Sequence, residues 1–291
     1  MTFQGPAAPV EKIVASLMNV RGVEAIALGG SQSRGEADPQ SDIDLGVYYE
    51  AGRLDLPALA QRLKEVDDGQ RDNLLNPPGA WGAWINGGAW LTVGGRPVDI
   101  LLRDLQRVEA VLQDCLAGRI TIDYQPGHPF GFVNTIYAAE THYCRPLWQG
   151  EARPLDRLKA LLTSEGRYPP QMREALVRKF LWEAWFSLAT GRKAAFKGDL
   201  NYAAGAVFRA VCSWVEVLYA LNNRYLMNEK GALKQVQGFA SKPDELEIRV
   251  QSVYRSLAEG EAEKAYRILD AIQREVEALA GGIELFQMEI R

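Results

Sequence analysis

Three aspartates in two apolar segments are the residues of this chain whose spacing best suits chemistry. Asp42 and Asp44 alternate with apolar residues in one segment, and Asp99 is flanked by Val98 and Ile100 in another. Successive side chains of a strand point to opposite faces, so Asp42 and Asp44 share a face. Neighbouring carboxylates repel unless a cation lies between them, and Mg²⁺ prefers oxygen ligands. The spacing therefore predicts a divalent metal site made by Asp42, Asp44 and Asp99.

A glycine-serine turn precedes the first of these segments. Gly29 and Gly30 allow the backbone to approach a phosphate closely, and backbone amides at the start of a helix favour anions. Ser31 and Ser33 each add a hydroxyl group, and Arg34 is near enough in sequence to reach a phosphate or to lie at the surface. We therefore expect the turn to bind the phosphates of a nucleotide.

The three carboxylates and the turn together predict a two-metal site. Two ions about 3.5–4 Å apart stabilise both the attacking and the leaving oxygen of an in-line displacement. Asp42 and Asp44 are expected to hold the ion bound to a triphosphate, and all three aspartates contribute to the second ion. The general base remains open at this stage, with Asp99, Glu140 and Glu183 as candidates.

The elements around these residues are expected to form a mixed α/β region. Apolar periodicity predicts helices at 10–20, 31–35, 56–66, 104–116 and 132–140. Alternation and turn residues predict strands at 23–28, 42–49, 89–93, 97–102 and 141–148. A turn at 38–40 should return the chain to the 42–49 strand, and a glycine turn at 94–96 should join two strands as a hairpin.

The loop at 67–88 is rich in Gly, Asn, Pro and Trp, and long loops in compact domains are usually functional. Trp81 and Trp84 in this loop, with Trp90 after it, either form an aromatic wall near the aspartates or pack in the core.

After residue 155 strand signals disappear and helical periodicity dominates. The predicted fold class is α+β, a mixed sheet flanked by helices, followed by an α-helical bundle. The predicted domains are residues 1–154, which carry the catalytic residues, and residues 155–291, which bind substrate or form an interface.

Composition restricts the classes of partner. Apolar and charged fractions of 47% and 24% are those of a globular protein. A net charge of −4 makes nucleic acid an unlikely partner and favours a small acceptor. The three cysteines have no paired spacing and are expected to be buried thiols in a reducing compartment. Neither a signal peptide nor a membrane span is expected, which predicts a cytoplasmic location.

The glycine-serine turn, the paired aspartates and Asp99 together resemble the signature of the DNA polymerase β-like nucleotidyltransferase superfamily. The arrangement with a helical domain is similar to aminoglycoside and lincosamide nucleotidyltransferases and to uncharacterised bacterial nucleotidyltransferase-domain proteins. The resemblance implies transfer of a nucleoside monophosphate, most often AMP from ATP, to a hydroxyl group with release of pyrophosphate. It implies Asp42, Asp44 and Asp99 as ligands of two Mg²⁺ ions, and Gly30 and Ser31 as phosphate binders.

Related enzymes bring a lysine of the helical domain to the triphosphate. Lys230 is the residue chosen for that role, with Lys197 in reserve.

Three functions remain open at the level of sequence. The first is transfer from ATP or another nucleoside triphosphate to a small hydroxylated molecule such as an antibiotic. The second is transfer to a protein or RNA, as in toxin–antitoxin systems, with a local basic groove around Arg173, Arg178, Lys179, Arg192 and Lys193 as its RNA-binding candidate. The third is an inactive nucleotide sensor. The protein is expected to be a monomer or a homodimer.

Overall fold

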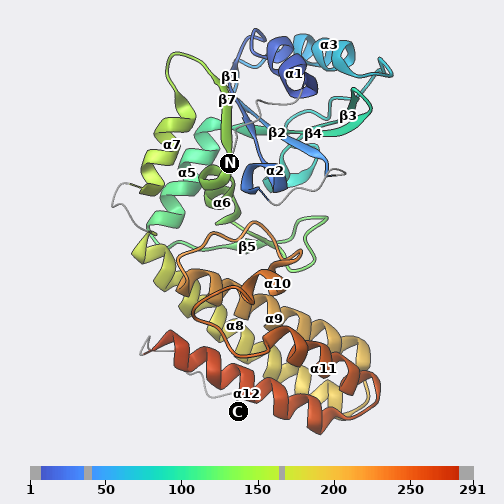
Figure 1. Cartoon of the computed structure of the whole chain (residues 1–291), viewed down its shortest axis with the longest axis vertical. Coiled ribbons are helices and arrows are strands. Elements are labelled where there is room, and N and C mark those ends of the chain that lie inside the picture. The colour runs from blue at the N-terminus through green and yellow to red at the C-terminus, as the bar shows by residue number, and fades with distance from the viewer. Residues whose placement is uncertain (1–7, 36–40, 164–167, 282–291) are drawn as a thin grey trace. The chain divides into compact units, whose positions relative to one another are not determined.

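The computed structural model describes residues 8–35, 41–163 and 168–281, so the predicted turn at 38–40 lies outside the described residues (Figure 1). The chain forms two compact units. The first comprises Met1–Gln113, Tyr124–Gly127 and Tyr137–Ser164, and the second comprises Asp114–Asp123, His128–Ile136 and Glu165–Arg291. The helix Pro154–Thr163 (α7) belongs to the first unit, where it packs against two of the strands.

The first unit is built on a five-stranded mixed sheet. Its strands are β1 (Val23–Leu28), β2 (Ile43–Tyr49), β3 (Gly88–Val93), β4 (Arg96–Asp104) and β7 (Arg145–Gln149). Its helices are α1 (Ala8–Leu17), α2 (Gly30–Arg34), α3 (Leu56–Val66), α4 (Gly82–Ile85) and α7, with most of α5 (Leu105–Leu116) and α6 (Ile136–Tyr143). The spatial order of the strands is β3-β4-β2-β1-β7. Only β2 and β4 pair in parallel, and the other neighbours are antiparallel.

One face of this sheet is apolar and covered by helices. Alternate residues of the two central strands are fully buried on it, namely Ile43, Leu45 and Val47 in β2 and Val98, Ile100 and Leu102 in β4. Side chains of α1 and α3, among them Ile13, Leu17, Leu59 and Leu63, belong to the same cluster. Because side chains alternate along a strand, the intervening residues of β2 and β4 must point to the other face.

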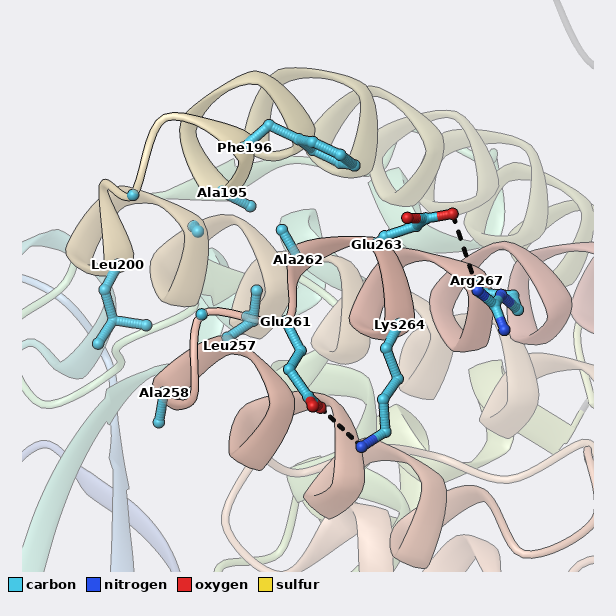
Figure 2. A pocket seen from close by; sticks show the side chains of 13 residues that line it. Ala195, Phe196, Leu200, Leu257, Ala258, Glu261, Ala262, Glu263, Lys264 and Arg267 are labelled. Carbon is cyan, nitrogen blue, oxygen red and sulfur yellow. Dashed lines mark hydrogen bonds and ion pairs between the residues drawn. The ribbon is translucent and has the colours of Figure 1, made fainter.

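The second unit is a helical bundle with a short hairpin. Its helices are α8 (Pro170–Phe196), α9 (Leu200–Leu221), α10 (Ala232–Val236), α11 (Leu246–Ala258) and α12 (Ala262–Ala280). The hairpin pairs β5 (Ile122–Asp123) with β6 (Phe132–Val133). Asp199 caps α9, since its carboxylate accepts a hydrogen bond from the Tyr202 amide at 3.1 Å. An open groove lies between the α8–α9 and α11–α12 connections (Figure 2).

Two predictions around residues 132–148 are wrong in their bounds. The helix predicted at 132–140 begins only at Ile136, because Phe132 and Val133 pair with β5 and are buried there. The strand predicted at 141–148 begins only at Arg145, because α6 continues to Tyr143. Apolar periodicity does not distinguish a short buried strand from the first turn of a helix.

Helix α9 is long and apolar enough to cross a membrane by length and composition. The apolar window of α9 is nevertheless 67% buried inside the protein. Its neighbours in the bundle include α8, α11 and α12. The apolar composition of α9 is therefore that of a core helix buried among other helices.

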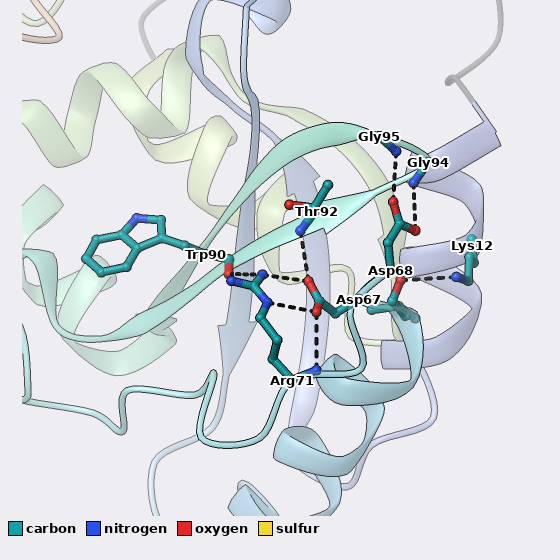
Figure 3. Close-up of polar contacts among 9 residues, drawn as sticks. Lys12, Asp67, Asp68, Arg71, Trp90, Thr92, Gly94 and Gly95 are labelled. Carbon is teal, nitrogen blue, oxygen red and sulfur yellow. Dashed lines mark hydrogen bonds and ion pairs between the residues drawn. The ribbon is translucent and has the colours of Figure 1, made fainter.

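The loop that follows α3 is fastened to the β3–β4 hairpin by two carboxylates (Figure 3). Asp67 is 2% exposed and accepts hydrogen bonds from the Thr92 amide at 2.9 Å and from two nitrogens of Arg71 at 2.7 and 2.9 Å. Asp68 accepts hydrogen bonds from the amides of Gly94 and Gly95 at 3.0 and 2.8 Å. Both glycines have positive φ, as a two-residue hairpin turn requires. These contacts fix β3 and β4, and with them the position of Asp99.

We predict that Asp67→Asn lowers the free energy of unfolding by about 2–3 kcal/mol at pH 7, because the buried carboxylate loses its charge-assisted hydrogen bonds from the half-exposed Arg71 and from the Thr92 amide. The hydrogen bonds from Arg71 hold the pKa of Asp67 well below its usual range. The stabilisation is therefore full above the unfolded-state pKa of about 4 and is lost as the pH falls. Urea unfolding at pH 7 and pH 3 measures both effects.

The matched control is Asp72→Asn, which breaks the exposed ion pair of Asp72 with Lys64 at 2.7 Å. We expect this change to cost less than about 0.5 kcal/mol. Equal losses in the two variants would show that the Asp67 contacts do not hold the hairpin.

Candidate functional site

The parallel register of β2 and β4 places two of the predicted aspartates side by side. Asp44 is paired with Asp99, and both are half-buried on the face opposite the apolar core. Asp42 lies just before β2, two residues from Asp44, and is exposed. Directly paired residues on adjacent strands are about 5 Å apart. The structure therefore brings together all three aspartates at the start of β2 and the middle of β4.

The glycine turn packs against the carboxylate of Asp44. The Gly29 amide donates a hydrogen bond to the Asp44 carbonyl oxygen at 2.8 Å. A Cβ atom on Gly30 would lie 1.7 Å from Oδ2 of Asp44, and the φ of Gly30 is +59°. Position 30 must therefore be glycine for two reasons, its backbone conformation and the space that the carboxylate occupies. The turn leads directly into α2, which carries Arg34 at its end.

The site concentrates negative charge. Burial, followed by repulsion from Asp99 and Asp42, raises the pKa of Asp44 to about 6, although Arg34 acts in the opposite direction. Burial and repulsion from Asp42 also raise the pKa of Asp99. Such shifts mean that the ionised carboxylates lack sufficient positive charge nearby.

The donor set fits a hard divalent cation in kind. Three carboxylates offer oxygen ligands from one sheet face, and their repulsion is relieved by positive charge between them. Over the described ranges, however, no group of three or more His, Cys, Asp or Glu side chains is already gathered as a metal cluster. A metal ion would therefore have to draw the three aspartates closer together.

Two of the candidate general bases already have partners. Both carboxylate oxygens of Glu140 accept hydrogen bonds from Arg103, at 2.7 and 2.8 Å, and Arg103 is 2% exposed. Glu183 lies in the second unit and forms an ion pair with Arg209. Arg103 was not among the predicted site residues; its burial in β4 requires a charged partner, and Glu140 provides it. Asp99 is the candidate base that remains beside Asp44.

The predicted phosphate binders have different surroundings. The Ser33 hydroxyl donates a hydrogen bond to the Gly30 carbonyl at 3.0 Å, which stabilises the turn, and Ser31 is half-buried in the first turn of α2. Lys230 is exposed in the α9–α10 connection of the second unit, and the reserve candidate, Lys197, ends α8. The roles of Ser31, Ser33 and Lys230 in phosphate binding stay predictions.

Two tryptophans, Trp90 and Trp81, lie next to the paired aspartates of β2 and β4. Trp90 on β3 is paired with Asp99 on β4, so its side chain shares the face of the aspartates. Trp90 is 59% exposed and stacks on Trp81, with the ring centroids 4.6 Å apart. Trp84 instead packs edge-on against Tyr137 at 5.7 Å. Trp90 is therefore not a core residue, and it offers a planar surface one strand away from Asp99.

Three features define the class of nucleotidyltransferase folds. They are a mixed sheet, a glycine turn before paired aspartates, and a third aspartate on the adjacent parallel strand. The comparison with family models agrees with this class. Residues 10–112 match the family model of the nucleotidyltransferase domain. The first unit therefore carries a nucleotidyltransferase domain, which confirms the predicted superfamily and supports nucleotidyl transfer as the general activity.

A nucleotidyltransferase-like protein from Exiguobacterium sibiricum 255-15 is similar to this chain over 94% of this chain and 77% of its own. The sequence identity is 12% and the TM-score is 0.44. A search of curated protein sequences finds no match.

We predict that Asp44→Asn stabilises the metal-free protein by about 1–2 kcal/mol at pH 7.5. A carboxylate whose pKa is raised in the folded state costs stability as the pH rises from about 4 through 6, and the amide avoids this cost. The difference should nearly vanish at pH 3, where the carboxyl group is largely protonated in both states. Denaturant unfolding in EDTA measures it, with Glu11→Gln at an exposed position of α1 as a neutral control. A destabilised Asp44→Asn at pH 7.5 would contradict the electrostatics described.

Gly30 and Gly35 provide a matched pair of substitutions. Both have positive φ, but a Cβ atom on Gly35 meets nothing within 4 Å, whereas one on Gly30 overlaps Asp44. Each alanine variant should lose about 1 kcal/mol from backbone strain. We predict that Gly30→Ala alone also abolishes the stabilisation of the protein by Mg²⁺, because it displaces the carboxylate. Thermal unfolding with and without Mg²⁺ measures this, and an equal Mg²⁺ response in both variants would refute it.

Proposed function

We propose that this protein transfers a nucleoside monophosphate, AMP from ATP, to a hydroxyl group of a small molecule with release of pyrophosphate. The observation that supports this most directly is the pairing of Asp44 with Asp99, with the Gly30 turn packed on Asp44. Carboxylates of this arrangement suit Mg²⁺, and two bound Mg²⁺ ions would neutralise charge on the triphosphate and the reacting oxygens. Asp42, Asp44 and Asp99 are the residues that would hold them.

In the proposed reaction, each part of the site has a separate task. The turn at Gly29 and Gly30 presents backbone amides to the phosphates and excludes side chains from the space beside Asp44. The acceptor oxygen forms a bond to the α-phosphorus of the triphosphate. At the same time the bond between the α-phosphorus and the oxygen that bridges the α- and β-phosphates breaks, and pyrophosphate leaves. Asp99 takes the acceptor proton, since Glu140 and Glu183 are engaged with arginines. The exposed ring of Trp90 offers a stacking surface for the nucleobase.

Charge distribution supports a small acceptor over RNA. The net charge is −4, and two of the five residues of the predicted basic groove form ion pairs with acidic neighbours. Arg178 pairs with Glu174 at 2.6 Å, and Arg192 pairs with Asp270 at 2.5 Å. Binding to a nucleic-acid backbone requires unpaired cations that release counterions from phosphates.

We predict that Asp42→Asn, Asp44→Asn and Asp99→Asn each lower the turnover number by about 100-fold or more, since the loss of one charged oxygen ligand weakens metal binding and transition-state stabilisation. Circular dichroism should show an intact fold. The matched control is Asp104→Asn, which removes a carboxylate from the other end of β4. Release of pyrophosphate from labelled triphosphates, with Mg²⁺ and a panel of hydroxylated small molecules, measures the effect.

The same assay separates the alternatives. Label transferred to RNA or to a protein, and to no small molecule, would replace the proposed acceptor class. Nucleotide binding without pyrophosphate release on any acceptor would indicate a sensor. Near-normal turnover of Asp44→Asn would refute the assignment of the catalytic residues.

A further inference from the structure

A cavity of about 200 Å³ lies within the second unit, lined by α9, α10, α11 and the segment around β6. Most of its wall is apolar, with Phe130, Val211, Val215 and Val250 among the lining side chains. Its volume exceeds that of an engineered apolar cavity of about 150 Å³ that binds benzene. The cavity is therefore large enough for a small organic molecule.

Two carboxylates near this cavity already have partners. Glu183 is paired with Arg209, whose guanidinium group also donates a hydrogen bond to the Phe130 carbonyl at 3.4 Å. Glu229 accepts a hydrogen bond from the Phe130 amide at 3.1 Å. The backbone of Phe130 is thus held from both sides, which fixes one wall of the cavity.

A third carboxylate on the cavity wall has no such partner. Glu216 lies in the middle of α9, lines the cavity and is 5% exposed. Among the described residues, none donates a hydrogen bond to its side chain or forms an ion pair with it. Burial, followed by repulsion from Glu229 and Glu183, raises the pKa of Glu216 to about 8. The carboxyl group is therefore mostly protonated at neutral pH, and a ligand cation beside it would stabilise the ionised carboxylate.

We propose that this cavity binds a small organic cation, an amine with an apolar body of about the size of a benzene ring, whose ammonium group pairs with Glu216. Three observations support a cation over a neutral ligand. Glu216 has no hydrogen-bond or ion-pair partner among the described residues, the Glu229 carboxylate on the cavity wall adds negative charge, and Arg209 is already paired with Glu183. The apolar walls suit the rest of the ligand. All of these residues belong to the second unit, so the proposal does not depend on nucleotidyl transfer.

The larger groove in Figure 2 lacks this feature. It is open, with the exposed ring of Phe196 on one side, and its charged groups are paired with one another. Glu261 pairs with Lys264 at 2.6 Å, and Glu263 lies 3.8 Å from Arg267. The groove therefore presents no buried group that needs a ligand.

Calorimetric titration of the full chain with 2-phenylethylamine and with its neutral analogue 2-phenylethanol tests the proposal. We expect the amine to bind at least tenfold more tightly than the alcohol. Glu216→Gln should remove this preference, because an amide of the same shape carries no charge. Val211→Phe should abolish binding of both probes, because the larger side chain fills the cavity. Glu259→Gln, at an exposed position after α11, is the matched control and should bind as the unaltered protein does.

Each possible result decides the question. No binding of the amine, or an unchanged preference in Glu216→Gln, would overturn the proposal. If Glu216→Gln fails to fold by circular dichroism, Val211→Phe alone decides, and retained binding there refutes the site. Asp44→Asn should bind the amine normally. Loss of binding in that variant would place the amine at the aspartates of the first unit and overturn the assignment to Glu216.

Discussion

Repulsion between adjacent carboxylates is the main constraint on the first unit, because its fold must hold these groups close together. The parallel register of β2 and β4 holds Asp44 beside Asp99, and Asp42 adds a third charge. Such an arrangement raises the free energy of the empty site, so the rest of the unit must hold it in place. The apolar face of the same strands, packed by α1 and α3, supplies that stability. The repulsion on one face of the sheet and the apolar packing on the other face both follow from the alternation of side chains along β2 and β4.

Each unit contains some acidic groups that have partners and others that lie close to like charges. In the first unit, Asp67 and Glu140 are paired with arginines and hold the hairpin and α6, while the repelling aspartates lie together at the site. In the second unit, Glu183 and Glu229 have partners, whereas Glu216 has none among the described residues. Burial, with repulsion from neighbouring carboxylates, raises the pKa of Asp44 and Asp99 in the first unit and of Glu216 in the second.

Much of the fold was predictable because local signals agreed with the tertiary result. The strand at 23–28 and the helix at 56–66 have the predicted bounds, and the two glycines between β3 and β4 specify their hairpin turn. The bounds failed near Phe132, where two buried apolar residues pair with a strand formed ten residues earlier. The periodicity of apolar residues indicates which face of a helix or strand is apolar, but it does not indicate which element packs against that face.

The sequence by itself determined the residue types of the site: three aspartates on strand-like segments and a glycine turn before two of them. The tertiary structure decided that Asp99 lies beside Asp44, that Glu140 is committed to Arg103, and that Trp90 is exposed on the same face. It also decided that Glu216 is buried beside a cavity, with no hydrogen-bond or ion-pair partner in the described part of the chain. The physical reason is that strand register and burial depend on contacts between residues far apart in the chain, whereas turn and strand preferences depend on neighbours.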